Sequence, residues 1–130
     1  MLEFHHIGIL VDDIESALRT YQGLFGVDDV DGPHEISSQG VRVCFLRMDR
    51  GNLEFVQQTS ASSILDTMRK RKVKYYHVGY LTRNIDDAVN ELCERDFKHI
   101  STFASEAFSM RKCAFLFSPE LHLVELIEQA

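Results

Sequence analysis

The chain has 130 residues, of which 45% are hydrophobic and 26% charged, and it carries a formal net charge of −6. Its composition is that of an ordinary globular domain, and its acidic balance excludes the basic footprint of a nucleic-acid-binding protein. No apolar run approaches the roughly 18 residues that a membrane-spanning helix needs, so we expect one soluble domain with neither nucleic acid nor membrane as a partner.

The N-terminus and the cysteines both indicate a cytoplasmic protein. The segment MLEFHHIGIL, residues 1–10, places an acidic residue and two histidines where a signal peptide has lysines before a long apolar run. Cys44, Cys93 and Cys113 are odd in number and form no C-x-x-C pair. This pattern favours buried, reduced thiols over disulfides or a structural zinc site.

In chain order, the first half predicts a strand, a helix and three further strands. EFHHIGILV, residues 3–11, is apolar and β-branched, and Asp12 or Asp13 can cap the helix that follows. The helix should stop at Gly23 or Gly26. Its apolar stripe is Ile14, Ala17, Leu18 and Tyr21, and the expected strands are HEISS at 34–38, VRVCFLRM at 41–48 and LEFVQ at 53–57.

A second copy of this unit begins 71 residues after the first. HHIGILVDDIESAL starts at His5 and YHVGYLTRNIDDAV at Tyr76, with five identities in the thirteen positions from His6 onward. Far downstream, residues 53–56 fall on residues 124–127 at the same offset, without gaps. The chain therefore contains two copies of one supersecondary unit.

The second copy predicts the same order of elements. Its strands are expected at 75–82, 99–105, 111–118 and 122–128, with a helix from about Asn84 to Arg95. Residues 62–74, SSILDTMRKRKVK, predict a short helix that ends in a basic segment. We expect an α+β fold of two tandem βαβββ modules, 1–60 and 75–130, joined by a linker at 61–74.

Two histidines and two glutamates occur in pairs on this offset. His6 and His77 lie in the first strand of each copy, and Glu54 and Glu125 lie in the last. Because side chains alternate along a strand, we expect the aliphatic face of Ile7 to lie under the helices and His6 to point the other way. A single histidine in a strand is commonly structural, and a single glutamate commonly faces solvent. Two matched pairs of this composition favour a site for zinc, nickel, cobalt, manganese or iron.

These motifs resemble the vicinal oxygen chelate superfamily, which includes glyoxalase I, methylmalonyl-CoA epimerase, bleomycin-resistance proteins and extradiol dioxygenases. The resemblance covers nearly the whole chain. It implies paired modules whose mixed sheet curves into a cup around a metal, and it implies a homodimer. The motifs that carry it are HHIGILVDDIESAL, LEFVQ, YHVGYLTRNIDDA and CAFLFSPELHLVELIE, and the ligands that it implies are His6, Glu54, His77 and Glu125.

The resemblance further implies a lyase or isomerase of glyoxalase or epimerase type that acts on a small molecule. In such enzymes a divalent nickel, cobalt, zinc or manganese ion holds a substrate oxygen and stabilises an enediolate or enolate. A carboxylate, here Glu54 or Glu125, moves a proton on the adjacent carbon. The substrate stays open, since Leu10 stands where bacterial glyoxalases commonly have arginine. Epimerases commonly have glutamine at the position of Glu54. They also commonly have an acidic residue just before the glycine that precedes the third strand, and this chain has Gln39 there.

Two other function classes remain, a small-molecule binding protein of the bleomycin-resistance type without catalysis and an iron dioxygenase. RKRKVK, residues 69–74, is either a solvated linker or a clamp for a phosphate-bearing substrate such as a CoA ester. His5 is a surface residue or a neighbour of the site. We expect His34, His99 and His122 to be structural. Phe45, Phe115 and Phe117 either line the cup or fill the core, and we expect the core; Arg47 or Arg111 could reach an acidic substrate.

Overall fold

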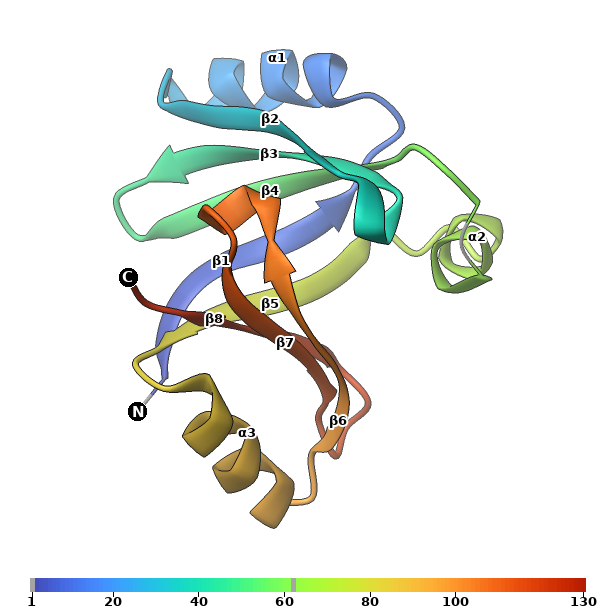
Figure 1. Cartoon of the computed structure of the whole chain (residues 1–130). Coiled ribbons are helices and arrows are strands. Elements are labelled where there is room, and N and C mark those ends of the chain that lie inside the picture. The colour runs from blue at the N-terminus through green and yellow to red at the C-terminus, as the bar shows by residue number, and fades with distance from the viewer. Residues whose placement is uncertain (1, 62) are drawn as a thin grey trace. The chain divides into compact units, whose positions relative to one another are not determined.

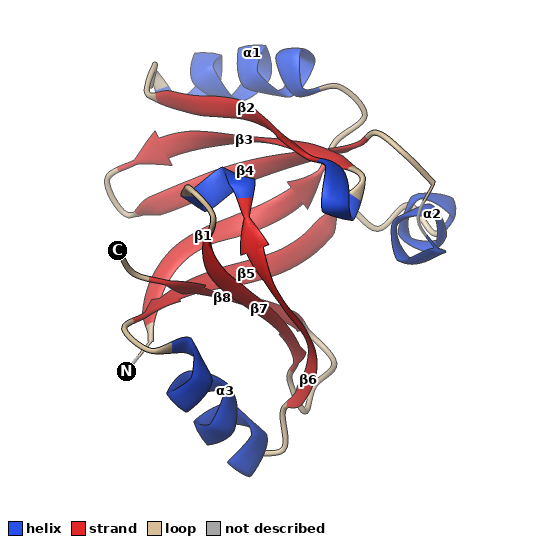
Figure 2. Cartoon of the chain, in the orientation of Figure 1, coloured by secondary structure: helices blue, strands red, loops and turns tan. Residues whose placement is uncertain are grey.

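The computed structural model describes residues 2–61 and 63–130 and confirms an α+β protein with the βαβββ order repeated (Figures 1 and 2). The first copy consists of β1 Glu3–Leu10, α1 Ile14–Phe25, β2 Val30–Ile36, β3 Val41–Met48 and β4 Gly51–Gln58. Helix α2 Ser63–Lys70 follows. The second copy consists of β5 Tyr75–Thr82, α3 Ile85–Glu94, β6 Lys98–Ser105, β7 Arg111–Phe117 and β8 Leu123–Glu128. Short 3-10 helices, η1 Ser37–Gln39 and η2 Glu106–Phe108, precede β3 and β7. The predicted helix before the basic segment is confirmed as α2. None of the helices in the described part of the chain is long and apolar enough to cross a membrane.

The chain divides into two compact units. The N-terminal unit is Ile7–Tyr76, and the C-terminal unit is His77–Ala130 together with Met1–His6. The division falls inside β1 and β5, so each of these strands contributes residues to both units. His6 consequently belongs to the same unit as His77 and Glu125, although 119 positions separate it from Glu125.

The N-terminal unit contains the strand order β2-β3-β4-β1, with β3 antiparallel to β2 and β4. Its helix α1 begins after Asp13, whose carboxylate accepts a hydrogen bond from the Ser16 N–H at 3.0 Å. The helix continues through Gly23 and ends at Gly26, which adopts the left-handed conformation with φ 63°. The predicted apolar stripe is confirmed, because Ile14 is part of a buried cluster against which Ala17, Leu18 and Tyr21 pack.

The C-terminal unit contains the order β5-β8-β7-β6, in which β5 and β8 are parallel and the other pairs antiparallel. Helix α3 places Ile85, Ala88 and Leu92 in a buried cluster with residues of β7 and β8. Val78 and Tyr80 of β5 pack against the same cluster. The expected aliphatic face under a helix is therefore confirmed in this module.

The same expectation is wrong for Ile7 of β1. The alternation is present, since His6, Gly8 and Leu10 are buried, but the Ile7 side chain is 38% exposed. Helix α1 packs on β3 and β4, and so it leaves Ile7 partly uncovered. The histidine-bearing face of β1 is thus its more deeply buried face.

The two modules match in three dimensions at the start of their helices. Asp13 caps α1 through the Ser16 N–H, and Asn84 caps α3 through the Asp87 N–H. In addition, a side chain from the last strand of each module accepts a hydrogen bond from the first helical N–H. Gln57 Oε1 accepts from Ile14 N at 3.0 Å, and Glu128 Oε2 accepts from Ile85 N at 2.9 Å. Both pairs obey the 71-residue offset, and we name this contact the strand-to-helix clasp.

We expect Glu128→Ala to lower the free energy of unfolding by about 1 kcal/mol, the usual size of a lost helix cap. The alanine leaves the Ile85 N–H without its acceptor and removes a negative charge from the N-terminus of α3. Urea unfolding measures the change, with Glu128→Gln as the matched control because the amide oxygen still accepts. Equal losses in both variants would show that the hydrogen bond of the clasp contributes nothing and that the charge of Glu128 accounts for the whole effect.

The repeat is not free of gaps, which corrects the sequence-based alignment. Glu54 faces Phe45 across β3 and β4, and Glu125 faces Phe115 across β7 and β8. The glutamates are 71 residues apart but the phenylalanines are 70 apart. The longer connection between β7 and β8 compensates for one residue missing earlier in the second copy.

The three cysteines are all free, as predicted, but they are not all buried. Cys44 and Cys113 are buried, whereas Cys93 is exposed on α3. Burial raises the pKa of the Cys44 thiol, which keeps it protonated and unreactive. The prediction of burial is therefore wrong for Cys93 alone.

Candidate metal centre

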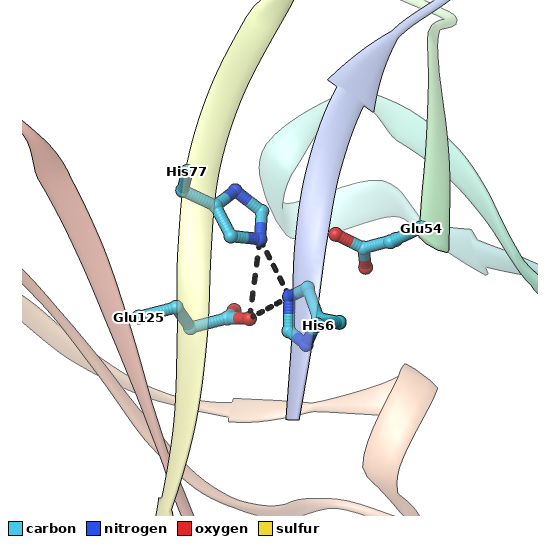
Figure 3. A group of neighbouring side chains, drawn as sticks. All are labelled: His6, Glu54, His77 and Glu125. Atoms are coloured by element: carbon cyan, nitrogen blue, oxygen red, sulfur yellow. Dashed lines mark hydrogen bonds and ion pairs between the residues drawn. The ribbon is translucent and has the colours of Figure 1, made fainter. Parts of the chain in front are cut away.

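Three of the four predicted ligands come together within the C-terminal unit. His6 from β1, His77 from β5 and Glu125 from β8 direct their polar atoms toward one another (Figure 3). The two Nε2 atoms are 2.8 Å apart, and Glu125 Oε1 lies 3.3 Å from His6 Nε2 and 3.5 Å from His77 Nε2. All three residues are buried, with exposures of 0%, 2% and 5% in chain order.

Gly79 creates the space that the His6 ring occupies. It lies two residues after His77 on the same face of β5, and it is the register partner of Glu125 in the parallel β5–β8 pair. A Cβ atom built on Gly79 would collide with the imidazole of His6. This close approach explains why the second copy carries a histidine and a glycine two positions apart in its first strand.

Two phenylalanine rings contact the histidines of this cluster. Phe115, the cross-strand partner of Glu125, has its ring centroid 5.6 Å from that of His77. Phe108 of η2 stacks on His6 with centroids 6.2 Å apart. Such an apolar environment excludes water and strengthens the interaction of the three ligands with a charged group.

The separations between the three ligand atoms fit a shared cation. Two ligands that each lie about 2.1 Å from one ion are about 3.0 Å apart at a right angle and about 3.4 Å apart at the tetrahedral angle. The three observed separations run from 2.8 to 3.5 Å. Imidazole nitrogen and carboxylate oxygen are also the donors that divalent first-row metals prefer. The residues present therefore fit a divalent metal ion.

The fourth predicted ligand, Glu54, belongs to the N-terminal unit. It lies on β4 opposite Phe45 and is buried, with an exposure of 3%. It corresponds to Glu125 both in the sequence offset and in its position opposite a phenylalanine of the preceding strand. The two glutamates thus occupy equivalent, buried places in their modules.

His5, whose place the sequence left open, is a neighbour of the site. Its Nδ1 is 2.8 Å from His6 Nδ1, and its ring contacts that of Phe108. Sequence reasoning also missed Phe108, because it comes from η2, a segment where the two copies have no similarity that could indicate a role.

The remaining candidates make other contacts. His34 bonds to Asp31 and His99 to Thr102, which agrees with structural roles. Phe45 and Phe115 are buried as predicted, but Phe117 is 36% exposed, so its assignment to the core is wrong. The two arginines are also engaged within the protein: Arg47 pairs with Asp29 and Asp31, and Arg111 donates to the backbone carbonyls of Phe108 and Glu128.

The basic segment lies at the end of α2 and in the connection to β5. Arg69, Lys70, Lys72 and Lys74 line a cavity of about 590 Å³ in the N-terminal unit, together with Asp12 and Asp66. All four of these cations are exposed, which agrees with a solvated segment. The same arrangement offers positive charge to an anionic ligand.

Fold and site together define an α+β protein of two βαβββ modules with a buried histidine–carboxylate cluster. The chain belongs to the glyoxalase/bleomycin resistance protein/dioxygenase superfamily, whose family model matches residues 5–129. This confirms the resemblance that the sequence motifs indicated. Among curated proteins, no sequence matches the chain significantly.

Solved structures share the fold over nearly the full length. A hypothetical protein from Bacillus halodurans is 25% identical with a TM-score of 0.86, and the match covers 99% of this chain and 95% of that one. A methylmalonyl-CoA epimerase in complex with methylmalonyl-CoA and NH4+ is 19% identical with a TM-score of 0.84, covering 100% and 96%. The methylmalonyl-CoA epimerase of Mycobacterium tuberculosis is 19% identical with a TM-score of 0.82, covering 98% and 88%. At 19% identity, the similarity to the two epimerases shows a shared fold only.

Proposed function

We propose that the protein is a metal-dependent lyase or isomerase of glyoxalase or epimerase type, which moves a proton on a carbon next to a carbonyl group. Its metal ligands would be His6, His77, Glu125 and Glu54. The observation that carries the proposal is the buried cluster of two imidazoles and one carboxylate, whose mutual distances match those of ligands on one cation. Glu54 is included because it is buried and occupies the position of Glu125 in the other module.

A divalent ion, when bound, would stabilise negative charge on the carbonyl oxygen of the substrate. The chain supplies the other parts of the reaction. A carboxylate of Glu125 or Glu54 takes the proton from the carbon, while the electron pair of the C–H bond stays on the substrate and is delocalised onto the carbonyl oxygen. The same carboxylate then returns the proton to that carbon or to its neighbour. The rings of Phe108 and Phe115 keep water away from the carbanion.

Two substrate classes agree with this chemistry, glutathione hemithioacetals and acyl-CoA esters. One structurally similar protein is an epimerase in complex with methylmalonyl-CoA, and the cations at Arg69, Lys72 and Lys74 would suit the phosphates of a CoA ester. We further propose that residues 1–130 work as one cytoplasmic domain and that the protein is a homodimer.

A second candidate function is an iron-dependent dioxygenase. His6, His77 and Glu125 form a two-histidine, one-carboxylate group, which is the ligand set of many non-haem iron oxygenases. Glu54 separates the two candidates. A fourth protein ligand leaves fewer positions for oxygen and substrate, and it supplies a second carboxylate for proton transfer.

We expect protein purified without chelator to contain about one nickel, cobalt, zinc or manganese ion per chain. We expect Glu54→Gln to retain part of this metal, because three ligands remain, but to lose proton exchange. Elemental analysis measures the metal, and NMR in deuterated water follows exchange at the carbon beside the carbonyl of hemithioacetals and acyl-CoA esters.

The outcomes of this experiment separate the candidates. Iron in the purified protein, with oxygen consumption and an unaffected Glu54→Gln variant, would favour the dioxygenase. Absence of metal, with none taken up on reconstitution, would refute the metal centre and leave a binding protein of the bleomycin-resistance type as the better account.

A further inference from the structure

We propose that His5 is a positioning residue of the metal centre, and this inference rests on the proposed function. Its Nδ1 accepts a hydrogen bond from the Nδ1–H of His6, and this bond directs the lone pair of His6 Nε2 toward His77 and Glu125. His5 thereby selects the tautomer of His6 that can bind a metal.

The geometry of the two neighbouring imidazoles carries the first step. His5 Nδ1 and His6 Nδ1 are 2.8 Å apart, and their rings are nearly perpendicular, with an interplanar angle of 89°. At this distance one nitrogen donates and the other accepts, since a neutral imidazole has one N–H and one lone pair. His6 presents its other nitrogen, Nε2, to His77 and Glu125. If Nε2 is the metal-binding atom, the hydrogen of His6 must be on Nδ1, and His5 Nδ1 must be the acceptor.

Phe108 holds both imidazoles in this arrangement. Its ring stacks on His6 and meets the ring of His5 edge to face, with centroids 5.6 Å apart. The guanidinium of Arg111 lies 5.9 Å from the centre of the Phe108 ring and is itself anchored on two backbone carbonyls. His5 is therefore part of a packed assembly and cannot be treated as a loose surface side chain.

The two histidine ligands differ in this respect. The residue before His77 is Tyr76, so the second copy has no imidazole at the position equivalent to His5. With His6 Nε2 as an acceptor, the 2.8 Å contact requires that His77 Nε2 carries a hydrogen in the metal-free protein. His6 is then prepared for a metal in advance, and His77 changes its tautomer only when the metal arrives.

The test compares two substitutions at His5 in the full chain. His5→Phe keeps a ring against Phe108 but removes the acceptor, and His5→Asn keeps an acceptor oxygen near the place of Nδ1. His99→Phe is the matched control, because His99 is an exposed histidine of the same unit with a local bond to Thr102. Nitrogen-15 NMR of the metal-free protein reports the tautomer of His6, and a competition titration with zinc reports its affinity.

We expect His6 to be in the Nδ1–H form in the wild type, in His5→Asn and in His99→Phe, and to lose this preference in His5→Phe. Zinc affinity should fall about 10- to 100-fold in His5→Phe, the usual effect of removing a partner of a metal ligand, and should stay close to the wild type in the other two. An unchanged His6 tautomer together with unchanged zinc affinity in His5→Phe would overturn the inference. If the wild type itself binds neither zinc nor nickel, cobalt or manganese, the proposed function fails instead, and the tautomer measurement alone decides the role of His5.

Discussion

Glu125→Gln should reduce the affinity for a divalent metal by more than about 100-fold, because even partners outside the ligand set are commonly worth 10- to 100-fold. The substitution keeps the shape of the side chain but replaces a carboxylate by a neutral amide. In the wild type, Glu125 Oε1 lies within 3.5 Å of the Nε2 atoms of both histidines. An amide at this buried position supplies no negative charge to balance the cation. A chelator competition titration with zinc or cobalt measures the loss.

Without added metal, the same variant should show no measurable proton exchange on the substrate. Glu120→Gln is the matched control, because Glu120 is an exposed glutamate in the connection between β7 and β8. If Glu125→Gln bound metal as tightly as the control, Glu125 would not be a ligand, and the interpretation of the buried cluster as a metal centre would have to be abandoned.

The second large effect is expected at Gly79. Gly79→Ala places a methyl group where the His6 imidazole lies. His6 is fully buried, so its ring cannot move out toward solvent. We expect the free energy of unfolding to fall by about 1–3 kcal/mol, the usual cost of overpacking a core. Metal affinity should fall as well, since any displacement of the ring moves Nε2 away from His77 and Glu125.

Gly23→Ala provides the control for the glycine-to-alanine change itself. Gly23 lies inside α1, and a Cβ atom there meets nothing within 4 Å. We expect a gain of about 0.5–1 kcal/mol, because alanine is the better helix residue. Urea unfolding compares both variants with the wild type. A Gly79→Ala protein with wild-type stability and full metal affinity would contradict the close packing of His6 on β5.

Much of the fold and part of the candidate site could be predicted because the relevant information is local or repeated. Helix α3 was predicted from its place in the second copy of the unit, and it was placed within one residue at each end. The alternation of side chains along a strand identified His6 and His77 as pointing away from Ile7 and Val78. The internal offset then paired each histidine with a glutamate, and the structure brings Glu125 to both histidines.

The predictions that failed depend on contacts between elements, which a pattern within one element does not contain. Ile7 is partly exposed because α1 packs on β3 and β4. Cys93 and Phe117 are apolar by type, but the faces on which they lie are not covered. Phe108 could not be found, because nothing in its short 3-10 helix indicates that its ring stacks on a histidine from the first strand.

The membership of His6 in the C-terminal unit has a consequence for biosynthesis. His6 is synthesised 71 residues before His77 and 119 residues before Glu125, the two partners that lie in the same unit. Until Glu125 has left the exit tunnel, the emerging chain lacks the carboxylate of this cluster, and closing so long a loop is a slow, late step of folding. A metal that needs this carboxylate could then bind only after Glu125 has been synthesised, and a chain that terminates before this residue would lack one member of the cluster.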